Sequence, residues 1–243
     1  LLSTVAQLAR QRGVMVHTHA SENNTECEMV EQETGMRNIA YLESVGISGK
    51  HVALAHCVHV DSDELNLLSS SGTNVAHCPS SNLKLGSGIA PVKEMLQAGV
   101  SVSLGADGAA CNNRLDMFTE MRTAALLQKA QHGPEVLPAL QTLRLATIEG
   151  AKAMGLNNEI GSLEIGKRAD LVVLSTSALH LTPAPKDLAS AIVYSAQPDD
   201  VQTVIIDGRL VLRDRELLTL NEAKVRSDAD EQAVELLKRA GVA

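Results

Sequence analysis

The chain has 243 residues, of which 44% are hydrophobic and 21% charged, and its formal net charge is −8. This composition is typical of a globular protein and excludes a disordered or collagen-like chain. Because the chain is acidic and has no basic cluster, we expect no nucleic-acid polymer as a partner.

Short apolar segments alternate with longer amphipathic ones in the first two thirds of the chain, which is typical of parallel strands joined by crossover helices. The predicted strands are rich in β-branched or small apolar residues and cover residues 14–19, 51–56, 74–78 and 100–105. Helices are predicted at residues 27–34, 38–45, 62–70 and 92–98. Two longer helices, 114–131 and 137–154, are predicted on either side of Pro134, which cannot continue a helix.

The last third of the chain has a different pattern. Residues 161–174 and 204–212 are predicted as strands, and Asp207-Gly208 is a dipeptide favoured in two-residue hairpin turns. A loop is predicted at 181–185, which contains two prolines. Residues 221–240 form a predicted helix with one apolar stripe. The stripe consists of Val225, Ala229, Ala233, Leu236, Leu237 and Ala240.

No apolar run approaches the roughly 20 residues that cross a bilayer. The first residues also lack a charged region followed by an apolar signal core. We therefore expect a cytoplasmic protein with no membrane partner. The cysteines are far apart and form no CxxC pair, which fits reduced thiols rather than a disulfide framework.

The segment from His17 to Glu22, at the end of the first predicted strand, carries the most chemical information. Alternation along a strand places His17 and His19 on one face. A neutral imidazole at a strand end is a good ligand for zinc or iron, and Glu22 is placed to reach a substrate proton beside the metal. The alternative is a packed pair of histidines with a solvated glutamate, and the pattern alone leaves both interpretations open. For His17, we favour packing, or a contact that orients a metal ligand, over direct binding of the metal.

His56 and Asp107 follow the second and fourth predicted strands. Taken singly, His56 is better interpreted as a core histidine. Asp107 alone is as readily a turn or helix-capping residue as a functional group. However, carboxyl ends of parallel strands meet at one edge, where α/β barrels build their active sites. Three of the four strands end in His, His and Asp, which favours a shared metal site.

These motifs together resemble those of the amidohydrolase superfamily. Within it, they are similar to the branch of methylthioadenosine/S-adenosylhomocysteine deaminases, 8-oxoguanine deaminases and triazine chlorohydrolases. The resemblance is carried by His19-Ala20-Ser21-Glu22, Ala55-His56-Cys57, the segment His77-Cys78-Pro79-Ser80-Ser81-Asn82-Leu83-Lys84-Leu85-Gly86, and Leu104-Gly105-Ala106-Asp107-Gly108. It extends over nearly the whole chain.

The resemblance implies an α/β fold. Residues 1–158 would form part of a TIM-type (β/α) barrel, its strands five to eight, followed by part of a small β-sandwich domain at 159–218 and a C-terminal helix at 219–243. The superfamily's first-strand His-x-His pair has no counterpart here. We therefore expect the chain to be truncated and inactive alone. The alternative is a non-catalytic half-barrel assembly module.

The resemblance also implies hydrolytic deamination of an aminated nitrogen heterocycle, by attack of a metal-bound hydroxide on the amino-bearing ring carbon. His19 and Asp107 would hold one divalent metal, zinc or else iron. Asp107 would also accept the proton of water, His56 would orient the hydroxide, and Glu22 would bind substrate and protonate its ring nitrogen.

His77 and Asn82 are predicted to contact substrate. The alternative is that the polar residues Ser80, Ser81 and Asn82 cap and close a loop at 80–88. Cys57 and Cys78, beside the site, are predicted to be small buried apolar residues rather than nucleophiles.

The predicted partners are water and a small heterocyclic substrate: a purine nucleoside, a thioether nucleoside or an oxidised purine. A triazine hydrolysed by a chlorohydrolase or aminohydrolase activity is the alternative substrate. We also expect a homo-oligomer.

Overall fold

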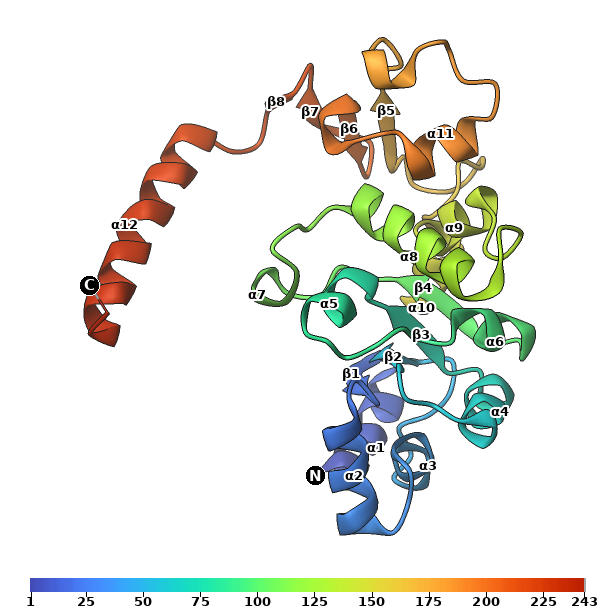
Figure 1. Ribbon diagram of the computed structural model, residues 1–243. Coiled ribbons are helices and arrows are strands. Elements are labelled where there is room, and N and C mark those ends of the chain that lie inside the picture. Colours follow the sequence, from blue (N-terminus) through green and yellow to red (C-terminus); the bar gives the residue numbers. More distant parts are fainter. Residues whose placement is uncertain (243) are drawn as a thin grey trace.

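The computed structural model describes residues 1–242, and these form one parallel and one antiparallel sheet of four strands each (Figure 1). The parallel sheet has the order β1-β2-β3-β4, so β1 and β4 are its edges within the described residues. Its strands are β1 (Val16–Ala20), β2 (Val52–His56), β3 (Asn74–His77) and β4 (Ser101–Leu104). The four predicted strands and their parallel pairing are therefore confirmed.

Helices connect successive strands of this sheet, and further helices follow its last strand, β4, in the sequence. They are α1 (Leu2–Arg12), α2 (Asn24–Thr34), α3 (Asn38–Ser44), α4 (Ser62–Ser71), α5 (Pro79–Lys84), α6 (Val92–Gln97), α7 (Ala109–Asn112), α8 (Met117–His132), α9 (Ala139–Leu145) and α10 (Ile148–Ala153). Every residue of β2 is buried, as expected for a central parallel strand covered on both faces. Apolar side chains of the strands, such as Leu54 and Val75, pack with helix residues such as Leu68 and Met95 to form the main core.

Three predicted elements differ from the structure. The helix predicted at 137–154 is two helices, α9 and α10, because Thr147 leaves the helical region at φ −125° and ψ −96°. The Thr147 hydroxyl donates to the carbonyl of Leu143 at 2.8 Å and so satisfies an acceptor at the end of α9.

The loop predicted at 80–88 begins as a helix, α5, with Pro79 at its first position, where a missing N–H costs nothing. The strand predicted at 161–174 is shorter, since only β5 (Leu171–Leu174) pairs with a neighbour.

The antiparallel sheet has the order β5-β6-β7-β8 and also includes β6 (Val201–Ile206), β7 (Arg209–Arg213) and β8 (Glu216–Leu217). Asp207 and Gly208 both have positive φ, 50° and 73°, as a tight turn of the I′ kind requires, so the predicted hairpin is confirmed.

Between β5 and β6 the chain forms two 3-10 turns (Leu179–Leu181 and Pro198–Asp200) and α11 (Leu188–Tyr194). Val193 of α11 packs with Met121 of α8 and Ala139 of α9 in a second apolar cluster. In Figure 1, this insertion lies over α8 and α9. Its contacts with these two helices link the antiparallel sheet to the part of the chain that contains the parallel sheet.

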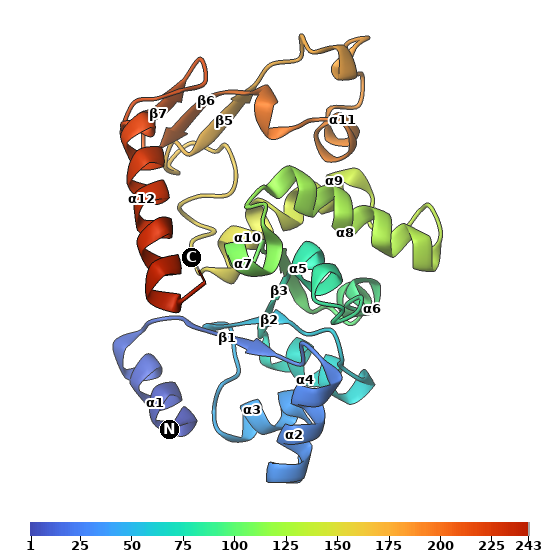
Figure 2. The same cartoon turned by 60° about the vertical axis from the view of Figure 1, so that its left-hand side comes forward.

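The last helix, α12 (Glu222–Ala240), carries the predicted apolar stripe but all of its residues are exposed. It stands apart from the rest of the molecule in Figure 1, and Figure 2 shows it as a single straight helix. Within residues 1–242, no helix combines the length and the apolar character that crossing a membrane demands.

The predicted division at residues 158 and 218 remains a prediction. The parallel sheet falls within residues 16–104 and the antiparallel one within 171–217.

Candidate metal centre

His19, His56 and Asp107 come together at one edge of the parallel sheet. His19 lies near the end of β1, His56 is the last residue of β2, and Asp107 follows β4. The parallel register pairs His19 with Ala55, so the two imidazoles lie next to each other, with ring centroids 5.3 Å apart. One ligand atom from each of the three residues lies within 4.8 Å of the others. Three residues that are distant in the sequence thus form one cluster.

The backbone turns sharply where these side chains leave the strands. His56 and Asp107 have φ of 74° and 61°, and Ser21, two residues after His19, has φ of 53°. Left-handed backbone at a residue other than glycine costs about 1–3 kcal/mol and is concentrated at functional sites. The strain at two of the three cluster residues supports a functional role for the cluster.

Glu22 lies beside the cluster. Its Oε2 is 4.0 Å from Nε2 of His56, and its Oε1 accepts a hydrogen bond from the Ser87 hydroxyl at 3.3 Å. The carboxylate of Glu26 accepts from the backbone amides of Ser21 and Glu22 at 3.1 and 2.7 Å. Glu26 therefore shapes the turn that presents Glu22.

His56 is only 1% exposed, and its Nδ1 is hydrogen-bonded to Oδ1 of Asn82 at 2.8 Å. Its other ring nitrogen, Nε2, faces Glu22. Since Nδ1 is engaged by Asn82, Nε2 is the ring atom that remains for a metal, water or substrate.

Asp107 accepts a hydrogen bond from the Ser81 hydroxyl at 2.5 Å and one from the Gly108 amide at 2.7 Å. Burial by itself raises the pKa of Asp107, but these two hydrogen bonds and the nearby His56 outweigh it and hold the pKa below its usual range. The side chain is therefore a carboxylate at neutral pH, which is the form that binds a metal.

The predicted substrate contacts, His77 and Asn82, are both buried, at 0% and 1% exposure. Neither ring nitrogen of His77 has a hydrogen-bond partner among residues 1–242. Burial, and then the charge of His56, lower the pKa of His77 to about 4, so its ring is neutral at pH 7. Contact of either residue with substrate remains a prediction.

His17 lies outside the cluster. It is exposed, and its Nδ1 lies 3.0 Å from the backbone oxygen of Ala53. Ser81 and Asn82 do not cap their own loop with their side chains, which was the alternative interpretation. Both instead contact residues at the ends of other strands.

The two cysteines beside the site have raised thiol pKa values. Cys57 and Cys78 are buried, and burial raises the pKa of the Cys57 thiol well above its usual range and that of Cys78 to about 12. A thiol that stays protonated is a poor nucleophile. Both residues are therefore the buried apolar residues that were predicted.

Sequence reasoning did not find four residues that hold the site: Glu26, Ser81, Ser87 and Glu120. Glu120 of α8 is completely buried and accepts hydrogen bonds from the Ser80 amide at 3.2 Å and from Asn112 Nδ2 at 2.8 Å. It thereby joins α5 to the loop that carries Asp107. Only the polar run 80–82 inside an otherwise apolar region indicated any of these contacts.

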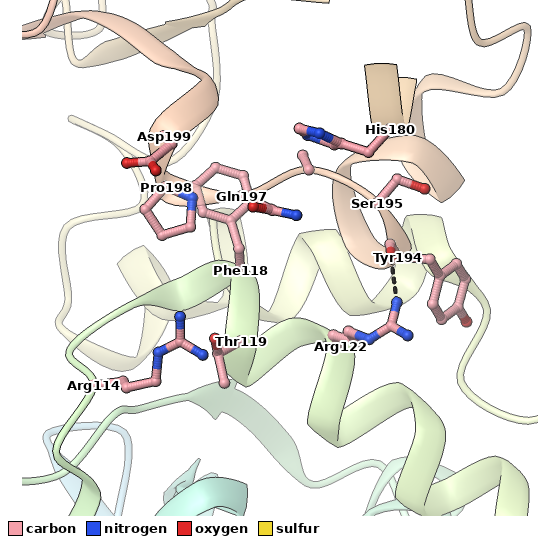
Figure 3. Close-up of a pocket in the computed structure, with 11 residues that line it drawn as sticks. Arg114, Phe118, Thr119, Arg122, His180, Tyr194, Ser195, Gln197, Pro198 and Asp199 are labelled. Atoms are coloured by element: carbon pink, nitrogen blue, oxygen red, sulfur yellow. Dashed lines mark hydrogen bonds between the residues drawn. The ribbon is translucent and has the colours of Figure 1, made fainter. Parts of the chain in front are cut away.

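A separate cavity of about 650 Å³ lies between α8 and the segment 194–199, and it shares no lining residue with the metal cluster (Figure 3). Arg122 of α8 donates to the backbone oxygen of Tyr194 across it. Arg114 and Asp199 lie at its other side. The hydrogen bond from Arg122 to Tyr194 helps to hold the segment that contains α11 against α8.

Residues 1–211 match the amidohydrolase family, and the chain therefore belongs to that family. It is 44% identical over 239 residues to a 5-methylthioadenosine/S-adenosylhomocysteine deaminase of Pelotomaculum thermopropionicum, an alignment that covers 98% of this chain and 55% of the relative. It is 46% identical to a 5'-deoxyadenosine deaminase of Methanothermobacter thermautotrophicus, with 97% and 55% covered.

Two solved structures are also similar. An adenosine deaminase from Xanthomonas campestris with bound zinc has a TM-score of 0.95 at 37% identity, covering 98% of this chain and 54% of that one. An atrazine chlorohydrolase from Arthrobacter aurescens in complex with zinc has a TM-score of 0.89 at 26% identity, covering 95% and 51%. The chain thus spans about half the length of the relatives it matches.

These similarities confirm the predicted family and the α/β fold. The parallel sheet and the small antiparallel sheet together correspond to about half of an amidohydrolase structure.

Proposed function

We propose that this chain carries the acid–base residues and part of the metal site of a hydrolytic deaminase that acts on a purine nucleoside with an amino-bearing ring. The observation that carries the proposal is the cluster of His19, His56 and Asp107 with Glu22 beside it. The substrate class is supported by relatives named as deaminases of methylthioadenosine, S-adenosylhomocysteine and 5'-deoxyadenosine.

The donor set fits the divalent metal that the family implies. Imidazole nitrogen and carboxylate oxygen are accepted by both zinc and iron. The ligand atoms of His19, His56 and Asp107 all lie within 4.8 Å of one another, near enough for two of these residues to hold one ion. We assign His19 and Asp107 as the residues that would hold the metal. When bound, the ion would lower the pKa of a water molecule and so supply hydroxide at neutral pH.

The protein side chains would divide the proton transfers between them. Asp107, a carboxylate at neutral pH, accepts the proton of the attacking water. Glu22, in its protonated form, delivers a proton to the ring nitrogen next to the amino-bearing carbon, so that negative charge does not build up on the heterocycle. Glu22 regains a proton from the hydroxyl of the tetrahedral adduct, and Asp107 passes the proton of water to the departing amino group, which leaves as ammonia. His56, with Nε2 directed toward Glu22, orients the water between them. The overall reaction consumes water, releases ammonia and leaves a carbonyl group on the ring.

Glu22 is suited to this role by its position. Its carboxylate is partly exposed, one oxygen is held by Ser87, and the other faces His56. A carboxylate fixed at one oxygen retains the second for proton transfer. The turn that Glu26 stabilises keeps that second oxygen near the cluster.

The second candidate is hydrolysis of a substituted triazine. It is favoured by the similarity to an atrazine chlorohydrolase, with a TM-score of 0.89. The sequence identity of 26% to that enzyme is lower than the 44% to the nucleoside deaminase, so we rank it second.

A non-catalytic assembly module is the third candidate. His19 is exposed, and β1 and β4 each pair with a single strand within residues 1–242.

Since the chain spans about half the length of its relatives, we propose that turnover requires further residues that complete the site. The 243-residue chain alone is then expected to bind zinc weakly and to release no ammonia.

The test uses the complete open reading frame that contains this chain. Ammonia release is measured with adenosine, 5'-deoxyadenosine, methylthioadenosine, S-adenosylhomocysteine and atrazine derivatives. We expect turnover of at least one nucleoside, and a loss of about 100-fold or more in kcat for Glu22→Gln, since general acid–base catalysis contributes about 10²–10⁴-fold. Glu28→Gln, an exposed carboxylate on α2, is the matched control. Turnover of triazines alone would support the second candidate, and no turnover of any compound the third.

His56→Gln separates the two roles open to His56. If His56 orients water, the variant retains its zinc and loses kcat. If zinc content falls in parallel with kcat, His56 is itself a metal ligand and the assignment must be changed.

A further inference from the structure

The segment 79–88, formed by α5 and the turn that follows it, contacts three of the candidate functional residues. The Ser81 hydroxyl donates to Oδ2 of Asp107 at 2.5 Å, and Oδ1 of Asn82 is hydrogen-bonded to Nδ1 of His56 at 2.8 Å. From the following turn, the Ser87 hydroxyl reaches Glu22. A single short segment therefore holds residues that come from three different strands.

This segment is itself anchored on both sides. The backbone amide of Ser80 donates to the buried carboxylate of Glu120. The ammonium of Lys84 donates to the carbonyl of Ala110 at 2.7 Å, and the ring Nε2–H of His59 donates to the carbonyl of Ser87 at 2.7 Å. Because its backbone is fixed at both ends, the segment can fix the side chains that it contacts.

We propose that Ser81 and Asn82 are positioning residues that orient Asp107 and His56 for metal and water. Oδ1 of Asn82 accepts a hydrogen bond from the Nδ1–H of His56, so that the lone pair of the neutral ring lies on Nε2 and faces the cluster. Ser81 holds Oδ2 of Asp107 and the Gly108 amide holds Oδ1, so the carboxylate is fixed at both oxygens while each keeps a further lone pair for a metal. The inference rests on the proposed function, because it is that function which gives Asp107 and His56 their tasks.

The burial of both positioning residues explains why their contacts matter. Ser81 is 0% and Asn82 is 1% exposed, so no solvent molecule replaces either hydrogen bond when the side chain is removed. Partners that orient metal ligands typically contribute about 10- to 100-fold to metal affinity. We expect a loss in that range at Ser81, whose partner Asp107 is an assigned metal ligand.

Neighbouring positions on α5 provide matched variants. Ser81→Ala and Asn82→Leu remove the hydrogen bonds at nearly constant size. Ser81→Thr keeps the hydroxyl, and Asn82→Asp keeps an oxygen that accepts from His56. Ser80→Ala is the control, because the Ser80 hydroxyl makes no hydrogen bond among the described residues and only its backbone amide is engaged.

The first measurement is zinc affinity of the 243-residue chain and its variants, by competition with a chromophoric chelator at pH 8, with thermal unfolding recorded for each. We expect about 10- to 100-fold weaker zinc binding for Ser81→Ala and recovery for Ser81→Thr. Asn82→Leu should bind zinc as the unmodified chain does, because its partner His56 is not an assigned metal ligand. A folded Ser81→Ala variant that binds zinc as the unmodified chain does would overturn the role of Ser81, and weaker zinc binding in Asn82→Leu would overturn the assignment of His56 to water. A loss in Ser80→Ala equal to that in Ser81→Ala would also overturn the role of Ser81, because α5 would then act through packing alone.

The second measurement needs neither metal nor activity. Long-range proton–nitrogen NMR of the histidine rings identifies which nitrogen of His56 carries the proton. We expect Nδ1–H in the unmodified chain and in Asn82→Asp, and a mixture of tautomers in Asn82→Leu. A proton on Nε2 in the unmodified chain would refute the role of Asn82. If these results hold but no deaminase activity is found, the positioning role stands and the proposed function fails.

Discussion

The pH dependence of stability tests the most unusual side chain of the site, His77. Its ring is fully buried, neither nitrogen has a partner within the described part of the chain, and burial lowers its pKa from 6.5 to about 4. Between these two pH values the unfolded chain binds a proton that the folded chain does not bind. Stability therefore falls as the pH falls through this window, by about 1.4 kcal/mol per pH unit and about 3 kcal/mol in all.

Two substitutions separate charge from polarity. His77→Leu and His77→Gln both remove the titrating group, so each should lose this part of the pH dependence. Between pH 7.5 and 5.0, the unmodified chain should lose about 2 kcal/mol that neither variant loses. At pH 7.5, His77→Leu should also be as stable as the unmodified chain or more stable, because an unpartnered buried polar group costs about 1–3 kcal/mol. His77→Gln keeps that cost.

The assay is urea unfolding of the metal-free chain at both pH values in the presence of a chelator. Comparing each variant with the unmodified chain cancels the titration of the other groups. If His77→Leu retains the full dependence on pH, then His77 is not a neutral buried ring and the reasoning is wrong.

Three further experiments, two substitutions and one thiol-labelling measurement, test how the chain packs. Glu64→Ala should destabilise the chain by about 3 kcal/mol, since it removes one of the acceptors of Arg37 and the acceptor of two backbone amides; a loss below about 1 kcal/mol in urea unfolding would contradict this. Cys57 and Cys78 should resist thiol reagents until the chain is unfolded, and rapid labelling of either in the native state would show that it is not buried. Asp116→Ala removes the cap of α8 and should cost about 1 kcal/mol, most of which Asp116→Asn should restore; equal stability of the two variants would argue against capping.

The cost of Glu64→Ala is set at the lower end of the range for buried ion pairs. Arg37 is 39% exposed, so water partly replaces its lost partner. The exposed Glu28 on α2 provides a control, because Glu28→Ala should leave the unfolding midpoint nearly unchanged.

The sequence alone determined the order of the elements and the groups with chemical potential. The alternation of apolar segments predicted the four parallel strands, because strand and helix periodicities differ and buried parallel strands are apolar throughout. The position of His19, His56 and Asp107 at strand ends predicted their convergence, since the carboxyl ends of neighbouring parallel strands share one edge. Both inferences depend only on local pattern and on topology.

The tertiary structure alone decided how these groups are held. No local pattern places the Ser81 hydroxyl on Asp107, or Asn82 on His56, because each pair is separated by 26 residues and meets only when β2, β3 and β4 align. The break at Thr147 also escaped prediction, because a hydroxyl that bonds back to a helix carbonyl is a matter of side-chain geometry. Residue types and periodicity thus determined where the chemistry lies, whereas the orientation of each group depended on hydrogen bonds between distant segments.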